Sequence, residues 1–404
     1  MVKRAKALLS DPPRRRFNPR PVLLITVLID LIGFAMIFPV LPFLSLKFGA
    51  SPVEGAMLVS IYSLMAFLSG PIWGRVSDRI GRRPTLLLTL LGATLGYIAV
   101  ALAPSLFWLY AARAWSGAMA GNIGVVMAGM ADITGTGGRA KAMGQIGAAF
   151  GLGFAIGPGL GGLIAGSGPD ANFAAPFLLA AGLSLAAAIL AFITLEETRP
   201  PVSRVPGAST APVRLFDSWD KRQLLAMFFI ANLAQSAAFA IIGFWADRVL
   251  SWDQRDVGLM MMVQGIVVAV LQGVAVDPLV RALGEVRAFL AAQLVMIAGC
   301  LALVASDQAV LIVLAFSAII GGQTLSYPLL NSLQSKRTAA DAQGAGLGLS
   351  NGMAALGRVF GPPLGGALLI GVSPDAPYLA VAGIGLIAVA WCVTQLRQPL
   401  MQRS

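Results

Sequence analysis

Residues 74–84 read GRVSDRIGRRP, a short basic segment between two long apolar runs. The preceding run extends from Glu54 to Trp73, and the following run extends from Pro84 to Ala103. Each run has the roughly 20 residues that an α-helix needs to cross the hydrocarbon of a membrane. Gly74 and Gly81 permit close approach and a tight turn. This stretch therefore predicts two membrane-spanning helices joined by a compact basic loop.

The rest of the chain repeats this alternation of apolar runs and polar loops. Of its 404 residues, 57% are hydrophobic and only 12% are charged, too few charges for a soluble domain of this size. The runs are continuous, which favours helices over a β-barrel. We predict an all-α membrane protein with twelve transmembrane helices in two pseudo-symmetric six-helix bundles. The expected spans are Pro21–Leu46, Glu54–Trp73, Pro84–Ala103, Ser105–Met127, Ala142–Ala165, Phe173–Leu195, Gln223–Leu250, Val257–Val276, Val286–Ala305, Ala309–Leu333, Gly344–Ile370 and Tyr378–Leu396.

The net charge of +11 is concentrated in alternate loops, and this placement predicts the topology. Because basic loops stay on the cytoplasmic side, both termini are expected in the cytoplasm of a bacterial-type inner membrane. The excess charge then faces anionic lipid, and we expect no nucleic-acid partner. The expected organisation is a tail (1–20), an N-terminal bundle (21–195), a linker (196–221), a C-terminal bundle (222–397) and a second tail (398–404).

The residue types also limit the chemistry. There is no His, and the two cysteines lie in apolar spans, so we expect neither a metal site nor a cofactor. No Ser/His/Asp or Cys/His constellation supports an integral-membrane enzyme. A channel is disfavoured because a two-fold repeat with one deep acid does not build a ring-shaped filter.

Two glycine-rich segments indicate an internal duplication. Residues 157–162 read GPGLGG in the fifth expected span, and residues 361–366 read GPPLGG in the eleventh. These spans occupy equivalent positions in the two six-helix halves. Duplication of this kind is typical of alternating-access carriers, whose binding site lies near the midplane between the halves.

Charged residues within the spans are candidates for function, because they are costly in a membrane. Asp30 is the only acid expected deep in a span, and Arg113 and Arg358 are its expected buried counterparts. We interpret Asp30 as the proton carrier, with Arg113 tuning its proton affinity. The alternative is a static ion pair between Asp30 and Arg113.

The loop at 74–84 resembles the signature loop of the major facilitator superfamily. The resemblance implies that Asp78 latches the two halves at the N-terminus of the eleventh helix, where an anion is favoured. Arg79 or Arg83 is then expected to pair with Asp132 at the end of the fourth span. The alternative is that the arginines only set topology. The implied latch comprises Gly74, Asp78, Arg79, Gly81, Arg82, Arg83 and Asp132.

Two further segments resemble superfamily motifs. The segment at 113–117 is similar to the fourth-helix motif, which implies a part for Arg113 in proton transfer. The fifth span is similar to the antiporter motif, which implies export. The alternative for the fifth span is ordinary small-residue helix packing. The motif residues are Gly153, Gly157, Pro158, Gly161 and Gly162.

Nearly the whole chain resembles the tetracycline-type branch of drug:proton antiporters. It departs from that branch at Gly96 and near Met296, where the branch carries acids, and it lacks the branch's eighth-helix His. The departures favour an apolar cargo over a metal chelate. We therefore expect a monomeric exporter whose partners are a small amphipathic molecule, protons and membrane lipid. An exporter of an endogenous metabolite, sugar or lipid is the alternative.

Buried amides at membrane depth need partners or a water-filled lumen, so polar residues in the spans are candidates for the substrate cavity. Each of them can instead bond across helices. The candidates are Asn122, Gln235, Gln264, Gln272, Gln323, Tyr327, Asn331, Asn351 and Arg358.

Overall fold

A computed structural model describes residues 19–198, 219–338 and 343–401, and within these ranges the ordered elements are all helices. Residues 1–18 of the expected N-terminal tail, residues 402–404 of the expected C-terminal tail and most of the expected linker lie outside them. The elements are α2 (Pro19–Met36), α3 (Leu41–Lys47), α4 (Pro52–Ile80), α5 (Arg82–Ala101), α6 (Leu106–Ala118), α7 (Asn122–Ala165), η1 (Gly168–Asp170), α8 (Ala174–Thr194), α9 (Trp219–Leu250), α10 (Gln254–Val270), the π-helical turn η2 (Leu271–Ala275), α11 (Val276–Val304), α12 (Ala309–Arg337), α13 (Gln343–Gly371) and α14 (Ala376–Met401).

Local sequence signals set several helix starts. Ser51 caps α4 through a reciprocal capping box, in which its hydroxyl accepts from the Glu54 amide and the Glu54 carboxylate accepts from the Ser51 amide. Asp253 and Asp256 form the same arrangement at the start of α10. These caps satisfy N–H groups that have no partner within the helix.

Ten helical segments of the described chain are long and apolar enough to cross a membrane. One of them, Gln254–Val304, has 51 residues, which is about 76 Å of helix and far more than one crossing needs. Gly284, with a positive φ of 73°, breaks its helical path. The remaining predicted span coincides with α6 and the first part of α7. The arrangement is consistent with the twelve predicted spans.

The fourth predicted span, Ser105–Met127, is not one continuous helix. It breaks between Ala118 and Asn122, where α6 ends and α7 begins. The Trp73 indole Nε1 donates to the Ala118 carbonyl at 2.6 Å, so the interruption leaves this backbone oxygen satisfied. The sequence patterns did not predict this break.

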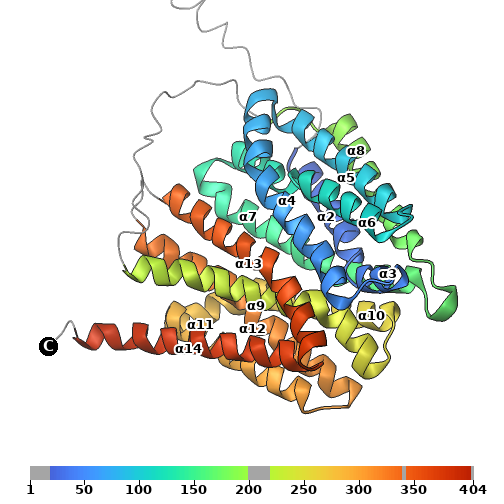
Figure 1. Cartoon of the computed structure of the whole chain (residues 1–404). Coiled ribbons are helices and arrows are strands. Elements are labelled where there is room, and N and C mark those ends of the chain that lie inside the picture. Colours follow the sequence, from blue (N-terminus) through green and yellow to red (C-terminus); the bar gives the residue numbers. More distant parts are fainter. Residues whose placement is uncertain (1–18, 199–218, 339–342, 402–404) are drawn as a thin grey trace, which may run out of the picture.

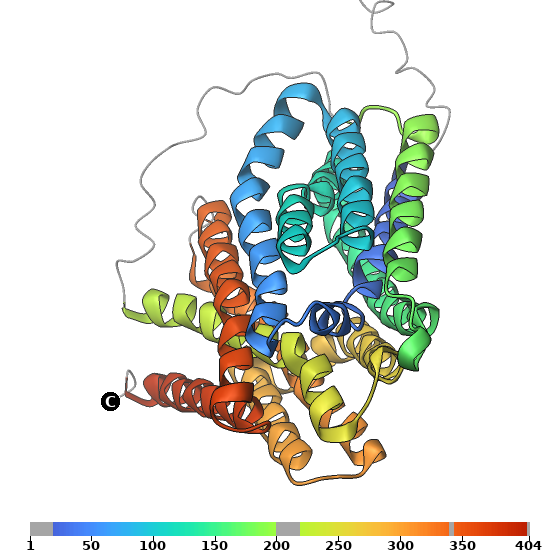
Figure 2. The ribbon, with the colours of Figure 1, turned by 45° about the vertical axis from the view of Figure 1, so that its right-hand side comes forward.

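The helices form two halves, residues 19–198 and residues 219–401 (Figure 1). In each half, the first and last described residues lie at the same end of the bundle, and we call it the terminal end. These residues are 19 and 198 in the first half, and 219 and 401 in the second half. The halves meet mainly where α7 packs on α10 and where α4 packs on α13. Figure 2 shows the second half crossing beneath the first, with α13 reaching up beside α4. The predicted all-helical fold in two bundles is confirmed.

The two halves are in close contact at the ends opposite the terminal ends. There, a Cβ added to Gly366 of α13 would lie 2.8 Å from Val53 of α4. Nearer the middle, the Ser60 hydroxyl donates to the Val359 carbonyl at 2.6 Å. Towards the terminal end, an added Cβ at Gly70 or Gly74 would meet no atom within 4 Å. The two halves therefore touch at one end and separate towards the other.

Candidate functional site

Asp30 lies on α2 with only 4% of its surface exposed, and it is the only acid among the buried side chains of the described chain. The Asn122 amide donates to its Oδ2, and the Ser184 hydroxyl donates to its Oδ1 at 3.4 Å. The donors come from α7 and α8, so three helices meet at this carboxyl group. Placement of Asn122 at the start of α7 depends on the helix break described above.

A cavity of about 40 Å³ adjoins Asp30, which is room for a few water molecules. Its wall comes from α2, α4, α5, α6 and α7, all in the N-terminal half. It includes Phe34, Tyr62 and Tyr97 as well as the Asp30 carboxyl group. Asp30 is thus buried yet has space beside it for water.

Arg113 is also buried, at 2% exposed, and no ion pair joins it to Asp30. Its guanidinium lies 4.5 Å from the centre of the Tyr62 ring, a cation–π contact, and its Nε donates to the Leu58 carbonyl at 3.4 Å. The same Tyr62 side chain also lines the Asp30 cavity. The static-pair alternative is absent from this conformation.

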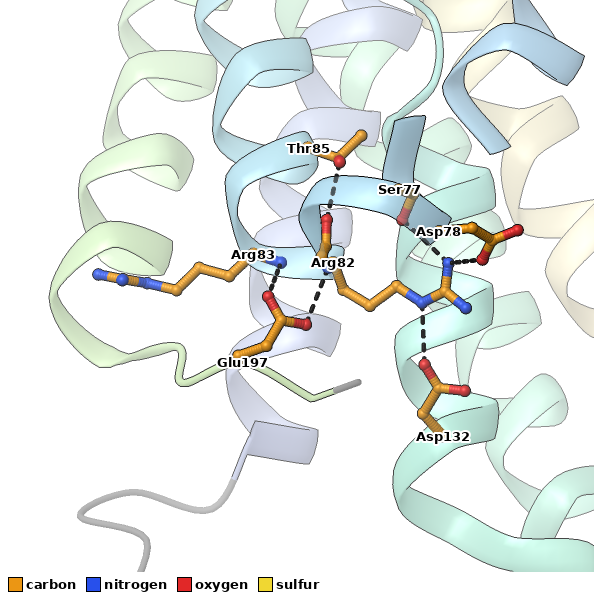
Figure 3. Close-up of polar contacts among 8 residues, drawn as sticks. Ser77, Asp78, Arg82, Arg83, Thr85, Asp132 and Glu197 are labelled. Carbon is orange, nitrogen blue, oxygen red and sulfur yellow. Dashed lines mark hydrogen bonds and ion pairs between the residues drawn. The ribbon is translucent and has the colours of Figure 1, made fainter. Parts of the chain in front are cut away.

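Arg82 is the centre of the 74–84 loop (Figure 3). Its guanidinium contacts the carboxylates of Asp78 at 2.8 Å and Asp132 at 2.9 Å, and it donates to the Ser77 hydroxyl at 3.0 Å. The expected pairing of Asp132 with Arg79 or Arg83 is therefore wrong. Arg82 occupies that place because it is the first residue of α5 and lies directly beside the end of α4.

Arg83 points the other way, towards α8. Its Nη2 donates to the Phe192 carbonyl at 2.6 Å, and its guanidinium lies 5.4 Å from the centre of the Phe192 ring. Asp78 is 62% exposed, and the ion pair found for it is with Arg82. Arg79 is exposed. The latch to the eleventh helix thus remains a prediction for another conformation.

Glu197 is a functional candidate that the sequence analysis missed. Its carboxylate accepts from the backbone amides of Arg82 at 2.8 Å and Arg83 at 3.2 Å, so it binds the N-terminus of α5. Gly81 between the helices has a φ of 103°, and an added Cβ would lie 2.3 Å from this carboxylate. The acidic pair at 196–197, directly after the sixth span, was the available signal.

The antiporter-motif glycines serve two interfaces. Gly157 and Gly161 pack α7 on α2, where added Cβ atoms would lie 2.7 Å from the Ile32 carbonyl and 2.0 Å from the Met36 carbonyl. Gly153 also faces α2. Gly162 faces α10 of the other half, and an added Cβ would lie 2.5 Å from Gln254. The motif therefore provides close packing both within and between the halves.

The candidate cavity residues of the C-terminal half do not form one site. Tyr327 donates to Asn351 across α12 and α13, and Arg358 donates to the Asn232 amide oxygen at 3.0 Å. Contrary to expectation, Arg358 is exposed rather than buried.

The remaining candidates differ in exposure. Gln264 and Gln323 are buried, Gln235 and Asn331 are half-buried, and Gln272 lies exposed in the π-helical turn. In the N-terminal half, Asn122 belongs to the Asp30 cavity. Glu285 pairs with Lys336 at the terminal end of the C-terminal half, a contact the sequence analysis also missed.

Comparison with known proteins places the chain among related sequences of one family. The family model described as Major Facilitator Superfamily matches residues 23–277 and 224–403. The chain is 32% identical to tetracycline resistance protein, class G, of Vibrio anguillarum, over 94% of this chain and 97% of that protein. It is 30% identical to multidrug resistance protein 2 of Bacillus subtilis (strain 168), over 91% of this chain and 94% of that protein.

Solved structures share the fold. A bacterial homologue of the human lysosomal transporter Spinster, in an inward-facing and occupied conformation, superposes with a TM-score of 0.74 at 13% identity. The alignment covers 94% of this chain and 96% of that one. The human organic anion transporter MFSD10 superposes with a TM-score of 0.70 at 24% identity, covering 95% of this chain and 100% of that one.

Proposed function

The chain belongs to the major facilitator superfamily, and we propose that it is a proton-coupled exporter of small amphipathic, drug-like molecules. As a member of that family it is a transporter rather than an enzyme. The drug cargo is supported by relatives that are named for resistance to tetracycline and to multiple drugs. The apolar walls around the polar groups of both halves support an amphipathic cargo.

The observation that carries the proton coupling is the setting of Asp30. A buried carboxyl group with no described cation within ion-pair distance is stable as the neutral acid and costly as the anion. Asn122 and Ser184 are placed to donate to the anion when the proton leaves. Asp30 therefore has the features of a site that alternates between two protonation states.

Alternating access is supported by the contact pattern between the halves. They pack through glycines at one end and separate at the terminal end, where Gly74, Asp78 and Arg79 are exposed. With both termini in the cytoplasm, this conformation opens to the cytoplasm and is ready to load cargo. Closure at the terminal end would bring Asp78 towards α13, as the latch requires. A monomer in lipid suffices for this cycle.

The test is transport in proteoliposomes of the purified full-length chain with an imposed pH gradient. The panel pairs drug-like probes, tetracycline and ethidium, with sugars and lipids. We expect pH-driven uptake of a drug-like probe and a loss of about a hundredfold or more in Asp30→Asn. Asp307→Asn is the matched control, because Asp307 lies exposed in a loop. Proton flux that Asp30→Asn leaves unchanged contradicts the coupling role, and transport of only sugars or lipids contradicts the drug cargo.

A further inference from the structure

A second cavity lies inside the C-terminal half, between α9, α11, α12 and α14. It has a volume of about 10 Å³, which is room for one water-sized group. Its wall is mainly apolar and includes Met227, Phe289 and Met296. Its polar residues are Gln293, Gln323 and Ser326.

Gln323 is the unusual member of this wall. It is 4% exposed, yet neither its amide nitrogen nor its amide oxygen has a hydrogen-bond partner among the described residues. Gln293, by contrast, donates to Ser326 at 2.8 Å. A buried amide without partners is unfavourable, and most such groups in proteins are satisfied. Gln323 thus offers one small group both a donor and an acceptor.

Equivalent packing in the two halves relates this cavity to the Asp30 cavity. Gly157 lies against the Ile32 carbonyl of α2, and Gly361 lies against the Leu233 carbonyl of α9. Asp30 stands two residues before Ile32, and Ala231 stands two residues before Leu233. Ala231 lines the second cavity as Asp30 lines the first. The C-terminal half therefore has a methyl group where the N-terminal half has its proton carrier.

The electrostatic setting of the second cavity selects against charge. None of the described residues that line it is acidic or basic. A cation in the cavity would therefore have no carboxylate among the lining residues to balance its charge. An uncharged group that both donates and accepts hydrogen bonds fits the cavity best.

We propose that Gln323 is the anchor of a cargo subsite that takes the terminal hydroxyl of an uncharged amphipathic molecule. The subsite admits only the tip of the cargo, and the apolar remainder lies outside it. The side chains of Met227 and Met296 are flexible enough to pack against tips of different shape. This inference rests on the proposed transport function and deepens it by naming the chemical class of the cargo.

The test uses two uncharged antibiotics of one skeleton, thiamphenicol and florfenicol, which differ in that fluorine replaces a terminal hydroxyl. Ethidium serves as a cationic probe. For the purified full-length chain in proteoliposomes with a pH gradient, we expect an apparent KM for thiamphenicol about three- to tenfold below that for florfenicol. Gln323→Leu should remove this difference by raising the KM for thiamphenicol. Gln334→Leu, a control on the same helix with 4% exposure, should keep it.

A second measurement separates binding from packing. Because Leu removes two unsatisfied polar atoms, Gln323→Leu without cargo should unfold at a temperature no lower than the parent. If that variant is not monodisperse, Gln323→Met of similar volume replaces it. If the Gln323 variant keeps the parent's ratio of the KM for florfenicol to the KM for thiamphenicol, the cavity holds only a buried water and the subsite is overturned. Transport of ethidium but of neither phenicol also overturns it. Absence of pH-driven transport of every probe contradicts the proposed function itself.

Discussion

The terminal ends of the two halves carry the same turn with opposite charges. Gly81 and Gly284 both have a positive φ, 103° and 73°, and each precedes a long helix. Arg82 follows the first glycine and pairs with Asp132, whereas Glu285 follows the second and pairs with Lys336. The turn and the ion pair are present in both halves, but the sign of each charge is reversed.

The reversal extends to a third position. Asp78 stands three residues before Gly81, and Arg281 stands three residues before Gly284. By position along the chain, the N-terminal residues Asp78, Arg82 and Asp132 read acid, base, acid, and the C-terminal residues Arg281, Glu285 and Lys336 read base, acid, base. The ion pair found among the latter joins Glu285 and Lys336. The comparison teaches that the geometry of the turn demands a glycine, while an ion pair can be built there with either sign.

The largest effect is expected from breaking the N-terminal cluster. Arg82→Glu leaves three carboxylates together and should lower the free energy of unfolding by about 2 kcal/mol. The triple variant Asp78→Arg, Arg82→Glu, Asp132→Lys copies the signs of the C-terminal cluster and should regain more than half of this loss. Thermal unfolding in detergent measures both.

Arg75→Glu is the control for this experiment, because Arg75 is an exposed arginine of the same loop. It should change the free energy of unfolding by less than about 0.5 kcal/mol. A triple variant no more stable than Arg82→Glu would show that the sign of each charge matters within the half.

Alanine substitution at Gly81 and at Gly284 should lower the free energy of unfolding by different amounts, and this difference is smaller than the effect of Arg82→Glu. Alanine at either position would have to adopt a positive φ with an extended ψ of 165°, a conformation nearly restricted to glycine, which costs about 1–3 kcal/mol. Gly81→Ala should cost roughly 1 kcal/mol more, since its Cβ would displace the Glu197 carboxylate from the α5 amides. An added Cβ at Gly284 would meet no atom within 4 Å. Equal shifts in unfolding temperature would contradict this account of Glu197.

The smallest effect belongs to the C-terminal pair. The Lys336 ammonium, through its hydrogen bond, holds the pKa of Glu285 below its usual value. A lowered pKa adds stability above the unfolded value of about 4.3, and this contribution disappears as pH falls through the folded value. Glu285→Gln should therefore cost up to about 1 kcal/mol near neutral pH and nothing in acid. If Glu285→Gln lowers the free energy of unfolding by the same amount at neutral and at acidic pH, the ionised pair is not the source of the loss. Asp307→Asn is the surface control.

Much of the fold was accessible from the sequence, because long apolar runs leave few alternatives in a membrane. The break between Ala118 and Asn122 was not, since no proline or charge marks it. It depends on Trp73, which is remote in sequence and supplies the missing hydrogen bond. Tertiary contacts of this kind are invisible to a pattern read along one helix.

The site was predicted in part for a similar reason. Asp30 and Arg82 attract attention as charges, whereas Ser184 and Tyr62 are ordinary in a helix until folding brings them to Asp30 or Arg113. The wrong partner for Asp132 arose because three arginines lie within five residues and only the turn at Gly81 selects among them.

One consequence follows from the position of α4. Its Tyr62 faces the space beside Asp30, and its Ser60 donates a hydrogen bond to the backbone of α13 in the other half. These two side chains stand within a single helical turn. In the proposed cycle, loss of the proton from Asp30 and displacement of α13 would therefore act on the same short piece of backbone, without any relay through the rest of the bundle.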